Sequence, residues 1–212
     1  MGMDLNTVET PKDVPASYAK AHPEPGYYRF NVQGMASMVS LMSAAGVLSD
    51  EPSPKFPERP APKDRKHQEL YDEVMGGNKE ARAKLKADEL KVIDAYVAAV
   101  RKLQKTRSTS ADKVPAYKFQ TNDGWFVSPD ECRLIARAMR NFATRVTATQ
   151  AKAANEASMQ RDEQLYKVVD PHGTMVRLTQ QTGMTVEELR TWMLDWADYN
   201  TLASFSGGYE VN

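Results

Sequence analysis

The sequence contains little that could hold a fold together through covalent or metal bonds. Cys132 is the single cysteine among 212 residues, so an internal disulfide framework and a cysteine-rich zinc site are both excluded. His22, His67 and His172 have no metal-binding spacing. The sequence therefore predicts no metal and no cofactor, and a fold that depends on its apolar core.

Long apolar runs are also missing. No stretch approaches the roughly 20 apolar residues that a membrane-spanning helix requires. The first residues lack the basic and apolar blocks of a signal peptide. Together with the single cysteine, these absences predict a soluble protein of the cytoplasm, with no membrane partner.

An excess of charge of either sign is absent from the whole chain, because 28 basic residues balance 28 acidic ones. The distribution is uneven, however. Residues 101–155 carry 11 basic and 4 acidic side chains, whereas residues 156–212 carry 4 and 9. Either the two segments neutralise each other within the fold, or the basic segment binds an acidic partner or a nucleic acid.

Motifs of catalysis are absent as well. There is no glycine-rich phosphate loop, no serine nucleophile elbow and no zinc-binding helix. Cys132 falls on the apolar side of a predicted helix, which favours a buried structural role over a nucleophilic one. These absences favour a non-enzymatic protein, although an enzyme of unrecognised class stays an alternative, since catalytic groups can converge in space.

The N-terminal part divides into three predicted segments. Residues 1–26 are proline-containing and polar, which predicts an extended arm. Residues 27–48 show helical apolar spacing and predict an amphipathic, methionine-rich helix that Asn31 can cap and Gly46 can end. Residues 49–63 contain five prolines and predict an extended linker, or a strap that Phe56 anchors to the core.

Residues 64–212 predict the main helical domain. Helices are expected over 64–75, from Asn78 to about residue 105, and from Pro129 onward, where Ser128 and Glu131 form a capping box. The apolar side of the helix after Pro129 extends to Ala153. A second capping box, Thr185 with Glu188, opens the last helix.

A small β component is predicted within this domain. The turn composition at residues 121–124 favours a hairpin near 117–127, and residues 207–211 could add a third strand. We expect the strand that ends at Val127 to be structurally coupled to the C-terminus, because a hairpin alone is marginally stable. The predicted fold class is mainly α, with a small antiparallel β-hairpin or three-stranded sheet.

Two side-chain patterns suggest binding surfaces. Met35, Met38 and Met42 could form an adaptable docking face. A second set is basic, and no acidic residue lies between positions 133 and 155, so it could bind phosphates or carboxylates. The alternative for this set is pairing with the acidic C-terminal helix. Its members are Arg133, Arg137, Arg140 and Arg145.

Residues 176–193 resemble the helix-turn-helix pattern. Leu178 precedes the expected turn, Gly183 lies in it, and Leu189 follows as a packing residue of the second helix. The resemblance implies a DNA-reading helix. That helix would present Glu187 and Glu188, which phosphates repel, so an ordinary helical corner is the favoured interpretation.

The sequence thus favours a non-enzymatic interaction, regulatory or assembly module that binds another protein or itself through its proline-rich N-terminal region, methionine-rich helix and arginine-bearing helix. A nucleic-acid-binding regulator that uses residues 101–155 or 176–193 is the alternative. The candidate partner-binding residues are Met35, Met38, Met42, Phe56, Arg133, Arg137, Arg140 and Arg145.

Overall fold

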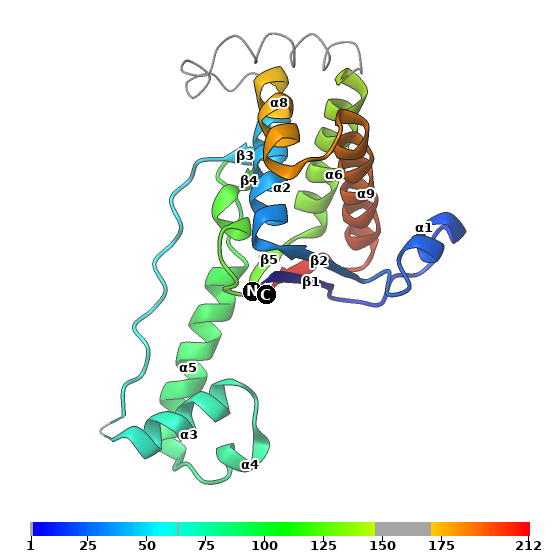
Figure 1. The fold of residues 1–212 in the computed structure, drawn as a ribbon. Helices are drawn as coiled ribbons and strands as arrows, with labels where there is room; N and C mark the ends of the chain where they lie inside the picture. The colour runs from blue at the N-terminus through cyan, green and yellow to red at the C-terminus, as the bar shows by residue number, and fades with distance from the viewer. Residues whose placement is uncertain (1, 63, 147–170) are drawn as a thin grey trace. The chain divides into compact units, whose positions relative to one another are not determined.

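The computed structural model describes residues 2–62, 64–146 and 171–212 (Figure 1). The chain forms two compact units, one built from residues 1–52 and 107–212 and the other from residues 53–106. The fold class is mainly α with a small antiparallel sheet, as the sequence predicts. None of the helices in the described ranges is long and apolar enough to cross a bilayer.

The larger unit contains a four-stranded antiparallel sheet. Its strands are β1 (Gly2–Thr7), β2 (Tyr27–Asn31), β5 (Trp125–Val127) and β6 (Tyr209–Val211), in the order β2-β1-β6-β5. The prediction of an extended arm over residues 1–26 is therefore wrong for β1. Met3 and Leu5 are buried and alternate with polar neighbours, which is the period-two pattern of a strand with one covered face.

The hairpin expected near residues 117–127 does not form. Residues Ala116–Phe119 make a 3₁₀ helix, η1, and Tyr117, Lys118 and Phe119 are all buried, which a strand covered on one face could not achieve. The predicted coupling to the C-terminus is confirmed, because β5 pairs with β6 in the register Trp125↔Val211 and Val127↔Tyr209. A short parallel pair, β3 (Leu48–Ser49) with β4 (Val114–Pro115), lies apart from this sheet.

Helix α2 (Val32–Ala44) is shorter than the helix expected over residues 27–48, because Tyr27–Asn31 are strand β2. The cap is the predicted one: the Gly34 amide donates to the Asn31 side chain at 2.6 Å. Gly46 follows the helix with φ +76°, the left-handed conformation expected of a helix-ending glycine. The capping residues thus correctly predicted both ends of the helix, but they did not predict the strand that precedes it.

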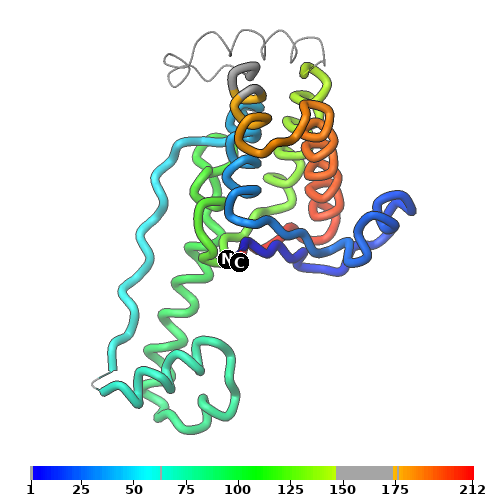
Figure 2. The backbone as a smooth tube through the Cα atoms, in the orientation of Figure 1, coloured from blue at the N-terminus to red at the C-terminus, as the bar shows by residue number. Residues whose placement is uncertain are grey.

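Helix α6 (Pro129–Arg145) and helix α9 (Val186–Phe205) pack along each other and, with α2, stand on one side of the sheet (Figure 2). Both predicted capping boxes are present at their N-termini. Cys132, Ile135, Met139 and Phe142 form the buried side of α6. The end of the predicted apolar series, Thr149 and Ala153, lies outside the described residues.

A buried ion pair connects η1 to α6 beneath strand β5. The Lys118 ammonium donates to Glu131 Oε1 at 2.7 Å and to the Phe126 carbonyl at 2.8 Å, and both charged side chains are almost completely buried. Glu131 Oε2 accepts from the amide and the hydroxyl of Ser128. Burial lowers the pKa of Lys118, and the adjacent Glu131 carboxylate opposes that shift.

The smaller unit is helical. Helices α3 (Arg65–Met75), α4 (Lys79–Arg82) and α5 (Ala87–Gln104) surround a core of Tyr71, Val74, Ala81, Leu85 and Ile93. The single helix expected from Asn78 to about residue 105 is therefore two helices, separated at residues 83–86. Asn78 caps α4, because its side chain accepts from two amides of that helix.

Gly208 provides a test of the strand junction. Its φ is +89°, and a Cβ atom there would lie 2.3 Å from the Val127 carbonyl oxygen. We expect Gly208→Ala to destabilise the protein by more than the roughly 1–3 kcal/mol that an unfavourable φ costs, because β5 and β6 must also separate. Urea denaturation measures the change.

Gly46→Ala is the matched control for Gly208→Ala. Gly46 also has a positive φ, +76°, but a Cβ there would meet no atom within 4 Å. It should lose only about 1–2 kcal/mol. Equal losses in the two variants would show that the contact with β5 is unimportant.

Candidate functional site

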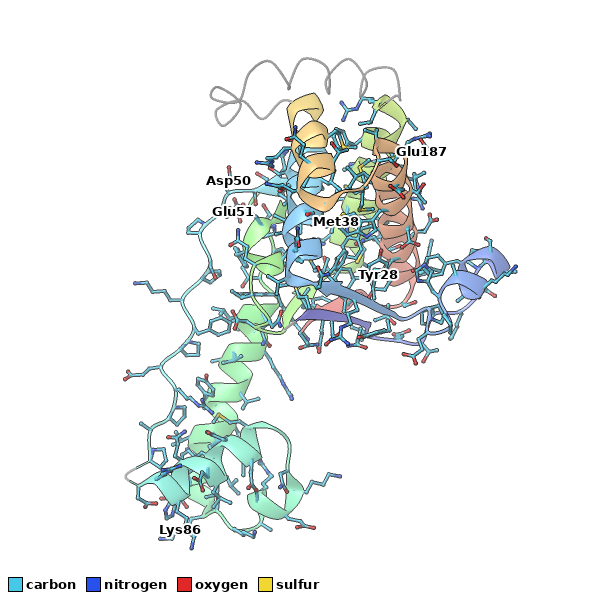
Figure 3. The ribbon with its side chains drawn as sticks, in the orientation of Figure 1. Tyr28, Met38, Asp50, Glu51, Lys86 and Glu187 are labelled. Carbon is cyan, nitrogen blue, oxygen red and sulfur yellow. The ribbon has the colours of Figure 1, made fainter. Side chains whose placement is uncertain are left out.

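The methionines predicted to form a docking face belong instead to the core. Met35 is 3% exposed, and Met38 and Met42 are fully buried. Met38 is labelled in Figure 3. Helix α2 packs against α6, α8 (Pro171–Thr182), η1 and strands β1, β2 and β3. The helical spacing correctly identified an apolar face, but it could not tell whether the cover came from this chain or from a partner.

Phe56 lies in the proline-rich segment, whose described residues after Ser49 form no helix or strand before α3. The side chain is 37% exposed, so it is neither buried in a core nor fully surrounded by solvent. Its role as the anchor of a strap stays a prediction.

Two of the four arginines on α6 form ion pairs. Arg140 donates to Asp198 of α9 at 2.6 Å and to Thr201 at 2.8 Å. Arg133 pairs with Asp130 of its own helix. The Arg140–Asp198 pair is the predicted alternative, in which the acidic C-terminal helix neutralises a basic residue of α6.

Arg137 and Arg145 have different surroundings. Both are exposed, and neither forms an ion pair with a residue in the described ranges. The Arg145 guanidinium lies 5.9 Å from the centre of the Phe142 ring, and its Nε donates to the Asn141 carbonyl at 3.3 Å. Two cationic groups of the predicted basic set are therefore not neutralised by the part of the chain that the structure describes.

A polar groove lies beside these two arginines. We call it the α6 groove; it is a cavity of about 530 Å³ between α6 and the chain that follows α2. Asp112 is the acidic side chain among its described lining residues, and it forms no ion pair with either arginine. The groove therefore carries a local excess of positive charge. The polar groups that line it are Gly46, Asp112, Arg137, Asn141, Thr144 and Arg145.

A second polar site was not predicted. His22 Nε2 lies 2.7 Å from Asp195 Oδ1, and the Tyr28 hydroxyl donates to Asp195 Oδ2 at 2.7 Å. The His22 ring stacks on Tyr18 with centroids 4.2 Å apart. Burial, with the nearby Asp195 charge, raises the pKa of Tyr28, so the hydroxyl stays a donor. His22 and Asp195 are 173 positions apart, and no sequence signal indicated their contact.

An open cavity of about 600 Å³ adjoins this cluster, and we call it the edge cavity. All five residues of β2 line it, together with Trp192 of α9 and residues 21–24. A histidine held by a carboxylate can act as a general base. However, the described lining residues include no serine, threonine, cysteine or lysine that it could activate.

The structure also bears on two other kinds of site, a cysteine nucleophile and a metal site. Cys132 is buried, and burial raises the pKa of its thiol far above the usual value, which does not suit a nucleophile. No group of three or more histidine, cysteine or acidic side chains in the described ranges could hold a metal ion.

The corner that resembles a helix-turn-helix is made by α8, Gly183 with φ +70°, and α9. Leu178 and Leu189 are buried, as a packed corner requires. Glu187 and Glu188 are exposed at the start of α9, where Glu187 is labelled in Figure 3. The helix that would read DNA therefore begins with two exposed carboxylates.

Comparisons of the chain with protein-family models, with curated proteins and with solved structures found no match.

Proposed function

We propose that this chain is a non-enzymatic interaction module that binds an acidic segment of a partner protein in the α6 groove. The observation that carries the proposal is the contrast within one helix. Arg133 and Arg140 have carboxylate partners, whereas Arg137 and Arg145 line a groove without one among the described residues. Arginine forms its strongest hydrogen bonds with carboxylates, often through two parallel contacts.

Other polar groups in the groove support a peptide ligand. Asn141 and Thr144 lie on α6 between the two arginines and can hydrogen bond to a peptide backbone. Asp112 lies in the same groove, and its carboxylate can accept from the backbone amides of a peptide, whereas a DNA backbone offers no such donor, so an acidic peptide fits better than a nucleic acid. The single, buried cysteine agrees with a reducing compartment, and the cytoplasm stays our proposed location.

The test titrates three fluorescein-labelled peptides with the full chain. The peptides are repeats of Glu-Ala, of Gln-Ala and of Lys-Ala, and binding is measured by fluorescence anisotropy at increasing salt concentrations. We expect the Glu-Ala peptide to bind most tightly and its affinity to fall as salt rises. Arg137→Gln should weaken binding by about 10-fold or more, since a hydrogen bond to a charged group contributes about 1.5–3 kcal/mol.

Arg133→Gln is the matched control for Arg137→Gln. It removes the same charge from the same helix, but Arg133 pairs with Asp130 and does not line the groove. Similar losses in the two variants, or no preference for the acidic peptide, would contradict the proposal. Tighter binding of a labelled 20-nucleotide DNA than of the acidic peptide would favour the nucleic-acid alternative.

A further inference from the structure

Strand β2 has one edge that faces away from the sheet, and the first amide on that edge, Tyr27, already donates to the Glu24 carbonyl at 2.9 Å. In the antiparallel pair β1–β2, the Thr7 amide donates to the Gly26 carbonyl at 2.9 Å, and bonded pairs alternate with unbonded pairs along such a ladder. Leu5–Tyr28 and Met3–Phe30 are therefore bonded pairs, whereas Asp4–Arg29 is not. Asp4 agrees with this assignment, because its amide and carbonyl bond to Asn212 on the opposite side, at 2.7 and 2.8 Å.

The amide and carbonyl of Arg29 consequently point outward from the sheet. No described strand pairs with this side of β2. The other edge of the sheet, β5, is covered. Helix η1 packs against β5, and the Lys118 ammonium donates to the Phe126 carbonyl at 2.8 Å. One edge is thus closed by η1, whereas no strand in the described ranges covers the other, and an uncovered edge can accept a further strand.

The edge cavity follows this open edge. Its lining includes each residue from Tyr27 to Asn31, so the cavity has the length of the strand. Its wall on the helix side contains Trp192, whose ring lies 5.8 Å from that of Phe30. The space beside β2 therefore combines the outward amide and carbonyl of Arg29 with an aromatic wall, which is the chemistry of strand addition.

Side chains along β2 alternate between two faces and define what an added strand should carry. Tyr28 and Phe30 are buried toward the helices, whereas Arg29 is exposed on the other face, 3.6 Å from Asp4. A peptide residue directly opposite Arg29 would share its exposed face, and the residues on either side would point toward Trp192. Arg29 favours an acidic residue opposite it, and the aromatic wall favours apolar neighbours.

We propose that β2 binds an extended peptide of a partner protein as a fifth strand of the sheet, with an acidic residue opposite Arg29 and apolar residues on either side. This site is separate from the α6 groove and does not depend on the function proposed for it. A second copy of the chain fits less well, because a two-fold axis centred on β2 would place Arg29 opposite Arg29, and like charges in directly opposed positions destabilise a ladder.

The test begins with two phage-displayed libraries of ten-residue peptides, one with glutamate and one with lysine fixed at the centre, selected on the immobilised full chain. The most enriched peptide is then synthesised, labelled with fluorescein and titrated by anisotropy. We expect enrichment from the glutamate library, and a preference for lysine-centred peptides after Arg29→Glu. Each charge effect should be about 2- to 5-fold, as expected for a cross-strand ion pair.

Two variants separate the backbone contact from the side chain. Arg29→Ala removes only the side chain, whereas Arg29→Pro also removes the outward amide, and proline is tolerated at an edge strand whose amide faces solvent. The proline variant should bind the selected peptide about fivefold more weakly than the alanine variant, since one hydrogen bond is lost. Thermal melts of both variants serve as the control, and each should still show a cooperative unfolding transition.

Hydrogen exchange gives an independent readout. Bound peptide should slow exchange at Arg29, and it should leave Tyr28 and Phe30 unchanged, because their amides already face β1. Equal binding by the Arg29→Ala and Arg29→Pro variants, or no enrichment from either library, would overturn the proposal. So would loss of the selected peptide in Arg137→Gln, which would place it in the α6 groove, or protection of Arg29 that appears with protein concentration alone, which would indicate self-pairing.

Discussion

Deletion of residues 207–212 is expected to abolish cooperative folding of the larger unit. These residues include β6, which lies between β1 and β5, so its loss separates the sheet into unconnected parts. Tyr209 is fully buried, its hydroxyl donates to Asn200 at 3.2 Å, and its ring lies 5.4 Å from that of Tyr199. Loss of one large core ring alone costs about 3–5 kcal/mol, a large part of the 5–15 kcal/mol that stabilises a typical protein.

The measurement is a thermal melt with tryptophan fluorescence. Trp125, which is 1% exposed and lies on β5, should become solvent-exposed after the deletion, with a red-shifted emission. Glu210→Ala is the control, because the Glu210 side chain is exposed on the same strand and its loss should leave the melt nearly unchanged. An unchanged melting curve and unchanged emission after the deletion would show that β6 does not hold the sheet together.

The parts of this fold that local chemistry determines could be predicted. Ser128 with Glu131 and Thr185 with Glu188 place each cap and its partner three residues apart, so their hydrogen bonds require no knowledge of distant segments. The coupling of the strand at Val127 to the C-terminus could also be inferred, because an isolated strand needs a neighbour and few β-like runs were available.

Elements that depend on distant partners were missed. Strand β1 is polar on one face, so its identity depends on β2 and β6 rather than on its own composition. The contact between His22 and Asp195 exists only after the first and last parts of the chain meet. The basic residues of α6 were recognised as a set, but the pairing of Arg140 with Asp198, 58 positions along the chain, depends on how α9 packs against α6.

The role of Lys118 also depends on residues outside its own segment, and its substitution should strongly lower the stability of the protein. In sequence it looked like a strand residue of a hairpin, whereas in the fold it is the buried cation that satisfies Glu131 and the Phe126 carbonyl. We expect Lys118→Met to cost about 3–5 kcal/mol, because it leaves a buried carboxylate without its counter-charge. Urea denaturation monitored by circular dichroism gives the change in unfolding free energy.

The double variant Lys118→Met, Glu131→Gln tests the reason for that loss. An amide at position 131 can still accept from the Ser128 amide, and because the amide is neutral it needs no counter-charge. The double variant should therefore be more stable than Lys118→Met alone, a non-additivity that reports direct coupling of the two charges. Arg140→Met is the control for an exposed pair, and its loss of the Asp198 contact should cost no more than about 1 kcal/mol. If Lys118→Met costs as little as Arg140→Met, the buried pair contributes no more than an exposed one, and the stability of the η1–α6 junction must come from the apolar residues around it.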